Sequence, residues 1–202
     1  MWTFRTRPWM YYGYFRVFDM DMHVNYSVPA DYSWHIQKAA EQSTIIQITD
    51  RVFCEGHPLY DPDAEYDDVA VQNNLEIIFD IHTTLSYWWF DPANSELGES
   101  QRIQWAKQDC SAYHNKLGAS NDHIRAIYLF DEPVRGPHGA NLTTSKLADM
   151  RSVAVDVWGS TPIMIVFHRL GDAEAAKPIP TLGNRTFDQV ADDYLPYCDW
   201  LG

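Results

Sequence analysis

Four short apolar runs recur along the chain, and each of them is rich in β-branched and aromatic residues. Their polar positions are few, which is typical of strands covered on both faces within a parallel sheet. The runs begin at Thr44, Leu75, Ile124 and Pro162. A weaker run from Phe15 to Met20 and the stretch from Tyr197 to Gly202 are interpreted as a first and a sixth strand.

The segments between these runs repeat apolar residues at spacings of three and four, which predicts amphipathic helices. The clearest covers residues 99–118 and the second covers residues 143–160, with Gly118 and Gly159 as candidate C-terminal caps. Weaker helical patterns occupy residues 30–43 and 65–74. The alternation of strand and helix predicts an α/β fold with a parallel sheet.

Long polar or Gly/Pro-rich connections follow the predicted strands, whereas the connections that precede them are short. The long ones run from Cys54 to Tyr66, from Thr83 to Gly98, from Pro133 to Asn141 and from Leu170 to Thr186. This asymmetry is typical of a (β/α)8 TIM barrel, in which chemistry occurs at the carboxyl ends of the strands. A doubly wound sheet shares it, but no G-x-G-x-x-G motif follows any strand.

Chain length modifies this prediction. A complete barrel takes about 250 residues and eight strands, and this chain has 202 residues. We therefore expect one domain over residues 1–202, a TIM barrel truncated after about six strands. The sequence indicates no internal repeat and no convincing linker.

Composition excludes several classes of partner. With 28 acidic and 15 basic residues and a net charge of -13, the chain cannot offer the basic face that nucleic acid requires. No apolar run approaches the roughly 18 residues of a membrane span, and no signal peptide is visible, so localisation stays open. Three widely spaced cysteines indicate neither a disulfide framework nor a metal site.

Polar residues gather where the predicted strands end, at what would be one edge of the sheet. In chain order they are Asp19, Asp21, His23, Asp50, Arg51, Asp80, His82, Asp131, Glu132, His168, Arg169 and Asp199. Glu132 stands out because it follows the apolar run "AIYLF" and precedes Pro133, which ends the strand. Partial desolvation there would raise its pKa from about 4.3 toward about 6, the range of a general acid. Alternatively, Asp131 and Glu132 only solvate the end of the strand.

The stretch "IYLFDEP", with "FDIH" before it and "YLPYCDWLG" after it, resembles the TIM-barrel glycoside hydrolases of clan A. The resemblance implies hydrolysis of O-glycosidic bonds in a poly- or oligosaccharide, with no cofactor. It makes Glu132 the general acid/base and places His82 among the residues that contact sugar. The clan usually has asparagine before the glutamate, whereas this chain has Asp131.

Further residues are expected to bind the carbohydrate at the same rim. Trp88 and Trp89 in "SYWWFDP" could stack on pyranose rings, as flat aromatic faces do. The remaining candidates are Asp50, Asp131 and His168.

The resemblance also implies a second carboxylate, which the family carries after a seventh strand and which would therefore follow Gly202. Retaining hydrolysis needs two carboxyl groups about 5 Å apart, and inverting hydrolysis needs about 6.5 to 9.5 Å. We therefore expect an enzyme in the full-length protein and no glycosidase activity in the 202-residue chain alone. The sugar, its linkage, the stereochemical outcome and the oligomeric state are not predicted.

Two other functions fit the same rim. A metal-dependent amidohydrolase barrel would use Asp21, His23, Glu132 and His168 as ligands, although Asn25 stands where a second histidine is expected. A non-catalytic carbohydrate-binding barrel would rely on Tyr87 together with Trp88 and Trp89, and Glu132 would then be dispensable.

Overall fold

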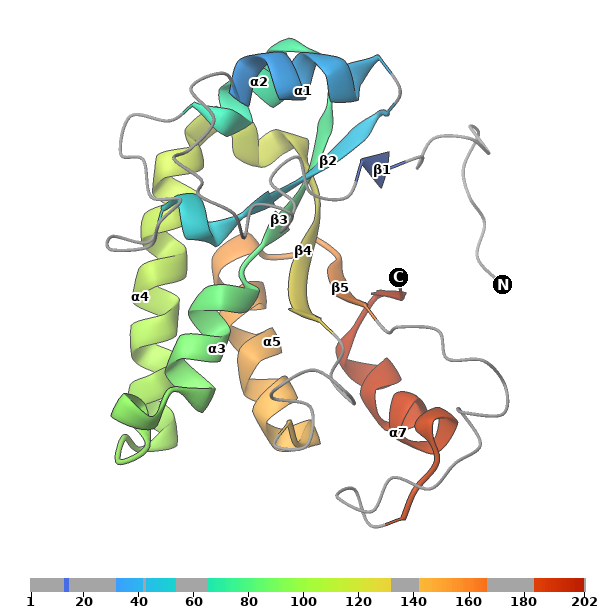
Figure 1. Cartoon of the computed structure of the whole chain (residues 1–202). Coiled ribbons are helices and arrows are strands. Elements are labelled where there is room, and N and C mark those ends of the chain that lie inside the picture. Colours follow the sequence, from blue (N-terminus) through green and yellow to red (C-terminus); the bar gives the residue numbers. More distant parts are fainter. Residues whose placement is uncertain are drawn as a thin grey trace.

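A computed structural model describes residues 13–14, 32–41, 43–53, 65–131, 142–166 and 184–201. Its centre is one parallel sheet of six strands (Figure 1). The strands are β1 (Gly13–Tyr14), β2 (Ile45–Thr49), β3 (Glu76–Asp80), β4 (Ile124–Asp131), β5 (Ile163–Val166) and β6 (Trp200–Leu201).

The strands lie side by side in the order in which they occur in the sequence. A doubly wound sheet reverses its strand order at one point, and the sheet of a barrel does not. The predicted parallel α/β sheet is therefore confirmed, including four of its strands and the short β6. The predicted strand at Phe15 to Met20 lies outside the described residues, and closure into a barrel stays a prediction.

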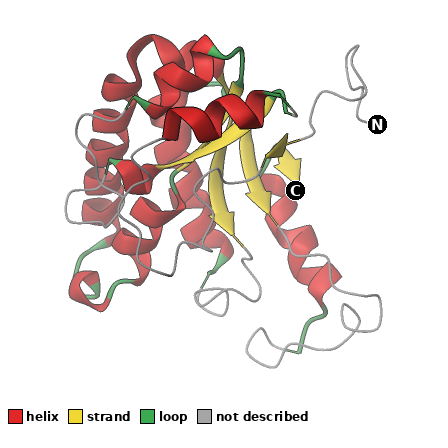
Figure 2. Cartoon of the chain, turned by 45° about the horizontal axis from the view of Figure 1, so that its top comes forward, coloured by secondary structure: helices red, strands yellow, loops and turns green. Residues whose placement is uncertain are grey.

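Most of the helices cover one face of this sheet, as Figures 1 and 2 show. Four helices match predicted segments: α1 (Tyr32–Ala40), α2 (Tyr66–Gln72), α4 (Glu99–Leu117) and α5 (Thr144–Trp158). The two predicted glycine caps are also present, because Gly118 and Gly159 follow α4 and α5 with φ of 50° and 62°. Short 3-10 helices join the elements: η2 (Asp50–Val52), η3 (Pro92–Asn94), η4 (Gly118–His123) and η7 (Leu195–Tyr197).

Two helices differ from the prediction. The expected loop from Thr83 to Gly98 is wrong, since α3 (His82–Phe90) and η3 occupy most of it. The periodic sequence signal for α3 is weak, but the helix buries Leu85 and Trp89, and two carboxylates cap its first turn, as described below. The helix α7 (Phe187–Tyr194), which contacts α5 and lies to its right in Figure 1, was not predicted either.

The two faces of the sheet pack differently. The face that the helices cover, called the outer face here, carries Ile48, Phe79 and Ile127. These residues pack with residues of the helices in the main core. Phe79 is fully buried, with its ring centroid 5.7 Å from that of Trp158 and 5.9 Å from that of Phe53. The inner face carries a smaller apolar cluster of Ile45, Ile78, Ala126, Tyr128 and Met164.

Two register shifts interrupt the alternation of faces in β4: against β3, Ile124 pairs with Ile77 but Ala126 pairs with Ile78, and a second shift occurs against β5. Tyr128 pairs with Met164, but Phe130, not Leu129, pairs with the next residue, Ile165. This register shift is a β-bulge, and it puts both Leu129 and Phe130 in the outer core. Bulges are common beside active sites, where they re-aim the last residues of a strand.

Candidate active site

The inner face of the sheet changes from apolar to polar toward the carboxyl ends of β2 and β3. Gln47 follows Ile45 on the inner side of β2, and Asp80 follows Ile78 on that of β3. The Gln47 amide Nε2 donates a hydrogen bond of 2.8 Å to Asp80 Oδ2, and the two residues are 6% and 7% exposed. At its carboxyl edge, the inner face therefore ends in the hydrogen-bonded pair of Gln47 and Asp80, next to the inner apolar cluster.

The first turn of α3 is held by two carboxylates, Asp80 at the end of β3 and Asp50 in η2, directly after β2. The N–H groups of a first helical turn have no partner within the helix, and negative charge there is favourable. The His82 N–H donates to Asp80 Oδ1 at 2.9 Å, and the Thr84 N–H donates to Asp50 Oδ2 at 2.7 Å. Asp80 is therefore a local cap, two residues before His82, and Asp50 is a tertiary cap, 34 residues before Thr84. Together they explain why a helix begins directly after β3.

Asp50 lies in an environment that disfavours its charge. The residue is 0% exposed, and burial together with the charge of Asp80 raises its pKa from 3.8 to about 6, against the opposing effect of hydrogen bonds from Thr84 and Thr83. The Thr84 hydroxyl is also 3.0 Å from the Tyr113 hydroxyl on α4. We call Gln47, Asp50, Asp80 and Thr84 the carboxylate corner.

His82 is the first residue of α3 and lies next to the corner. Its ring packs edge to face on Phe130, with the centroids 4.6 Å apart, and Phe130 in turn contacts Phe90 at 5.8 Å. Arg51 Nε donates to the Thr83 hydroxyl at 2.9 Å. These contacts fix the start of α3 against the ends of β2 and β4.

The structure brings together two of the predicted site residues, Asp50 and His82, at the carboxyl edge of the sheet. Asp131 ends β4, where it pairs with Val166, but its side chain is not among those described. Glu132 and His168 lie outside the described residues, as do Asp21 and His23 of the metal-site alternative.

The two predicted sugar-stacking tryptophans lie on α3, not in a loop, and they differ in environment. Trp89 is 7% exposed and belongs to the main core. Trp88 is half-buried between α3 and α4, where its Nε1 donates to Asp109 Oδ2 at 2.8 Å. Neither observation tests sugar binding, which stays a prediction for both residues.

Sequence reasoning assigned no role to Gln47, Thr84 or Asp80, although Asp80 was noted at a strand end. The signal for Gln47 was present: it is the one polar residue inside the apolar run "IIQI". A lone amide at an inner position of a buried strand indicates a polar partner on the next strand.

Within the described ranges, no group of three or more His, Cys, Asp or Glu residues could hold a metal ion. Within the same ranges, no helix is long and apolar enough to cross a membrane. The prediction of a cofactor-free site is not tested by these observations.

Comparison with known proteins shows similarity in fold alone. No family model and no curated protein matches the sequence. Among solved structures, a protein assigned as an alpha-L-fucosidase from Bacteroides thetaiotaomicron VPI-5482 matches with a TM-score of 0.55 and 12% identity, over 96% of this chain and 63% of that one. Xylanase B from Clostridium stercorarium F9 matches with a TM-score of 0.53 and 15% identity, over 83% of this chain and 56% of that one.

This chain therefore spans less than two thirds of the length of either similar structure. Both of these proteins are glycoside hydrolases by name, and the chain shares their general fold.

Proposed function

We propose that this chain is the larger part of a glycoside hydrolase-like (β/α) barrel that hydrolyses O-glycosidic bonds in a poly- or oligosaccharide. One observation carries the proposal: the strands follow one another in sequence order, and β4 runs to Asp131, so that Glu132 is the next residue along the chain. The likeness in fold to an alpha-L-fucosidase and a xylanase supports it.

Glu132 is proposed as the general acid/base. It would protonate the leaving glycosidic oxygen and then, in a retaining mechanism, deprotonate the attacking water. The bulge within β4 supports this role, because such irregularities re-aim the residues at the end of a strand. The second carboxylate that the mechanism requires is proposed to follow Gly202 in the chain.

The carboxylate corner has a supporting role in this proposal. Asp80 links Gln47 on β2 to the backbone of His82, so the start of α3 is fixed relative to the inner face of the sheet. His82, Asp131 and His168 are proposed to contact the sugar. Asp50 is fully buried, so its proposed contribution to binding is through the position of α3.

The decisive experiment compares Glu132→Gln with wild type in the full-length natural product that contains this chain. Aryl α-L-fucosides and β-xylosides with methylumbelliferyl and dinitrophenyl leaving groups serve as substrates. We expect kcat/KM for the methylumbelliferyl glycoside to fall by about 10²- to 10⁴-fold. The loss should be smaller for the dinitrophenyl glycoside, whose leaving group needs little protonation.

Glu96→Gln is the matched control, because Glu96 is exposed and lies between η3 and α4. An equal loss for both leaving groups would argue against the acid role, and unchanged kinetics in Glu132→Gln would overturn it. Sugar binding without turnover by the wild type would favour the non-catalytic barrel. A stoichiometric metal that is required for turnover would favour the amidohydrolase alternative.

A further inference from the structure

An exposed group of aromatic rings lies on the outer surface, where the end of α3 meets α4. Tyr87 and Trp105 are 47% and 37% exposed, and Trp88 lies between them. The Trp88 ring centroid is 4.9 Å from that of Tyr87 and 5.1 Å from that of Trp105. We call these three residues the α3/α4 aromatic surface.

The rings are held in place before any ligand arrives. Trp88 packs against both neighbours, and its indole N–H is bound to Asp109, whose pKa is raised by burial against the opposing effect of that hydrogen bond. A contact that uses fixed rings loses little conformational entropy when a ligand binds. The position of Trp88 therefore makes Tyr87 and Trp105 a preorganised surface.

Amide side chains border Trp105 on α4. Gln101 and Gln108 are four residues before and three residues after Trp105, so they lie next to it on the helix surface, and both are exposed. Gln101 Oε1 accepts the Gly98 N–H at 3.2 Å, which orients its amide. Planar amides offer paired donors and acceptors to neighbouring hydroxyl groups, while ring faces cover apolar C–H surface.

The size of the surface argues against a protein partner. An aromatic side chain carries about 150–250 Å² of surface, so at these exposed fractions Tyr87 and Trp105 together offer roughly 200 Å². A stable protein interface needs about 800 Å² from each partner. The aromatic area is instead on the scale of a few sugar rings.

The net charge of the chain limits which classes of polymer could bind at this surface. A net charge of -13 repels polyanions. At the nearest helical positions, Trp105 is flanked by the neutral amides Gln101 and Gln108 and by two charged side chains that are bound within the protein: Arg102 donates to the Asn94 and Ser95 carbonyls, and Asp109 accepts from Trp88. The ligand chemistry that fits is an uncharged chain of rings with hydroxyl groups.

We propose that Tyr87 and Trp105 form a second carbohydrate site, outside the active site, which binds a neutral oligosaccharide by stacking and amide hydrogen bonds. This inference rests on the proposed function, because it takes a carbohydrate as substrate. Both sites would share α3, which begins at the carboxyl edge of β3 and extends nine residues, about 13 Å, to its end beside the aromatic surface. A substrate chain bound at the α3/α4 aromatic surface would stay close to the carboxyl edge of the sheet, where the active site is proposed.

The test measures binding of xylohexaose, cellohexaose and fucosyllactose by calorimetry, in the Glu132→Gln background so that turnover does not interfere. Trp105→Ala and Tyr87→Ala should each weaken binding of the preferred probe about 5- to 10-fold, the scale of one lost aromatic contact. Trp105→Phe should retain most of the affinity. Leu195→Ala is the matched control, because Leu195 is 43% exposed on a different element and should leave affinity unchanged.

Unchanged affinity in Trp105→Ala and Tyr87→Ala, with thermal melting shown to be intact, would overturn the proposal. So would the absence of binding of all three probes. If Trp105→Ala instead abolishes self-association seen by sedimentation, the surface joins two copies of this chain and the proposal fails. The Glu132 kinetics are independent of all these results, so failure here leaves the proposed hydrolysis to be judged separately.

Discussion

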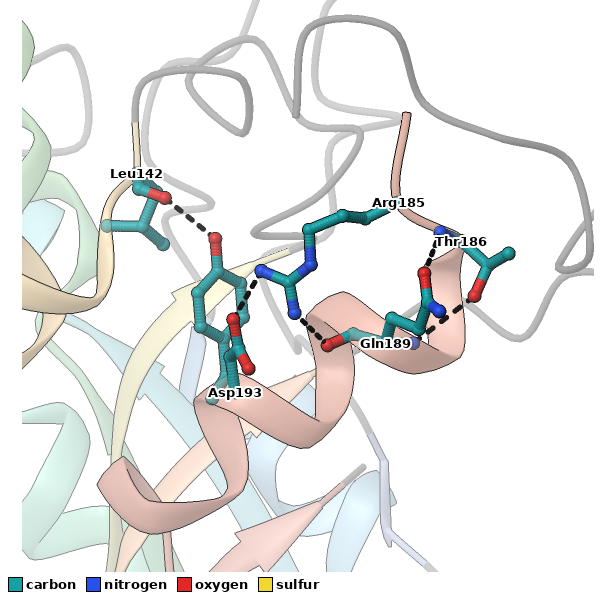
Figure 3. A network of polar contacts seen from close by, with 6 residues as sticks. Leu142, Arg185, Thr186, Gln189 and Asp193 are labelled. Atoms are coloured by element: carbon teal, nitrogen blue, oxygen red, sulfur yellow. Dashed lines mark hydrogen bonds and ion pairs between the residues drawn. The ribbon is translucent and has the colours of Figure 1, made fainter. Parts of the chain in front are cut away.

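Two polar networks hold the start of a helix in this molecule, and they do so in opposite environments. The carboxylate corner fixes α3 from inside the protein with Asp50 and Asp80. The second network fixes α7 at the surface, where Thr186 and Gln189 cap each other and Arg185 contacts both Asp193 and the Gln189 carbonyl (Figure 3).

The pKa values of the carboxylates in the two networks shift in opposite directions. The hydrogen bond from Arg185 lowers the pKa of Asp193, and the positive charge of the guanidinium acts in the same direction. Burial and a second carboxylate raise the pKa of Asp50, although it accepts hydrogen bonds from Thr84. Hydrogen bonds alone therefore do not keep a buried carboxylate ionised, and the difference lies in desolvation and in the sign of the nearest charge.

The largest expected effect comes from removing Asp80. Asp80→Ala takes the acceptor away from two donors, the Gln47 amide and the His82 N–H, in a site that water reaches poorly. Each such loss costs about 1–3 kcal/mol, so we expect the free energy of unfolding to fall by roughly 2–5 kcal/mol in urea titrations. Asp80→Asn keeps one acceptor and should lose less. A difference below about 0.5 kcal/mol between Asp80→Ala and wild type would contradict a structural role for the corner.

The next effect is a pH dependence caused by Asp50. The folded state raises the pKa of this group, so its protonated form stabilises the fold fully below pH 3.8, and the contribution is lost as pH rises through about 6. Asp50→Asn cannot ionise, but its amide oxygen can still accept from the Thr84 N–H. From pH 4 to pH 7.5, the stability of Asp50→Asn relative to wild type should rise by about 3 kcal/mol, the scale of a shift of two pKa units.

Urea unfolding at four or five pH values measures this difference. Parallel stability profiles for Asp50→Asn and wild type would show that Asp50 ionises normally. Asp80 is the other acid that faces it, so the same titration in Asp80→Asn should show a smaller pH dependence from Asp50.

The smallest effect is expected at the surface network. Thr186 accepts the Gln189 N–H at 3.4 Å as the cap of α7, and Thr186→Ala should lower the free energy of unfolding by about 1 kcal/mol. Thr186→Ser keeps the hydroxyl and should be close to wild type. If Thr186→Ser loses as much as Thr186→Ala, the methyl group and not the cap is responsible.

How far the fold could be predicted depended on whether a segment's own residues determined its structure. The runs that became β2 to β5 are predominantly apolar, and α4 carries its stripe and its terminal glycine, so local patterns were enough. α3 lacks an apolar stripe, and although Asp80 caps His82 locally, its second cap, Asp50, lies 34 residues before Thr84. A contact between residues so far apart leaves no trace in a local pattern.

The candidate site was predicted to a similar extent. Asp50 was correctly placed at a strand end, but its complete burial under α3 depended on a helix that was expected to be a loop. Gln47 was treated as part of a strand, although an amide inside an apolar run already signals a partner. Glu132 remains a prediction from its position after β4.

The bulge in β4 has a consequence for how mutations in this strand would be tolerated. Between the two register shifts, the even-numbered Ala126 and Tyr128 face inward, whereas the even-numbered Phe130, after the second shift, belongs to the outer core. The phase of the alternation thus reverses within one strand. Deleting Leu129 would remove the extra residue and leave Phe130 and Asp131 paired as they are, whereas a deletion away from a register shift would turn every residue beyond it to the opposite face. This strand can therefore accept a change in length at the bulge more readily than elsewhere.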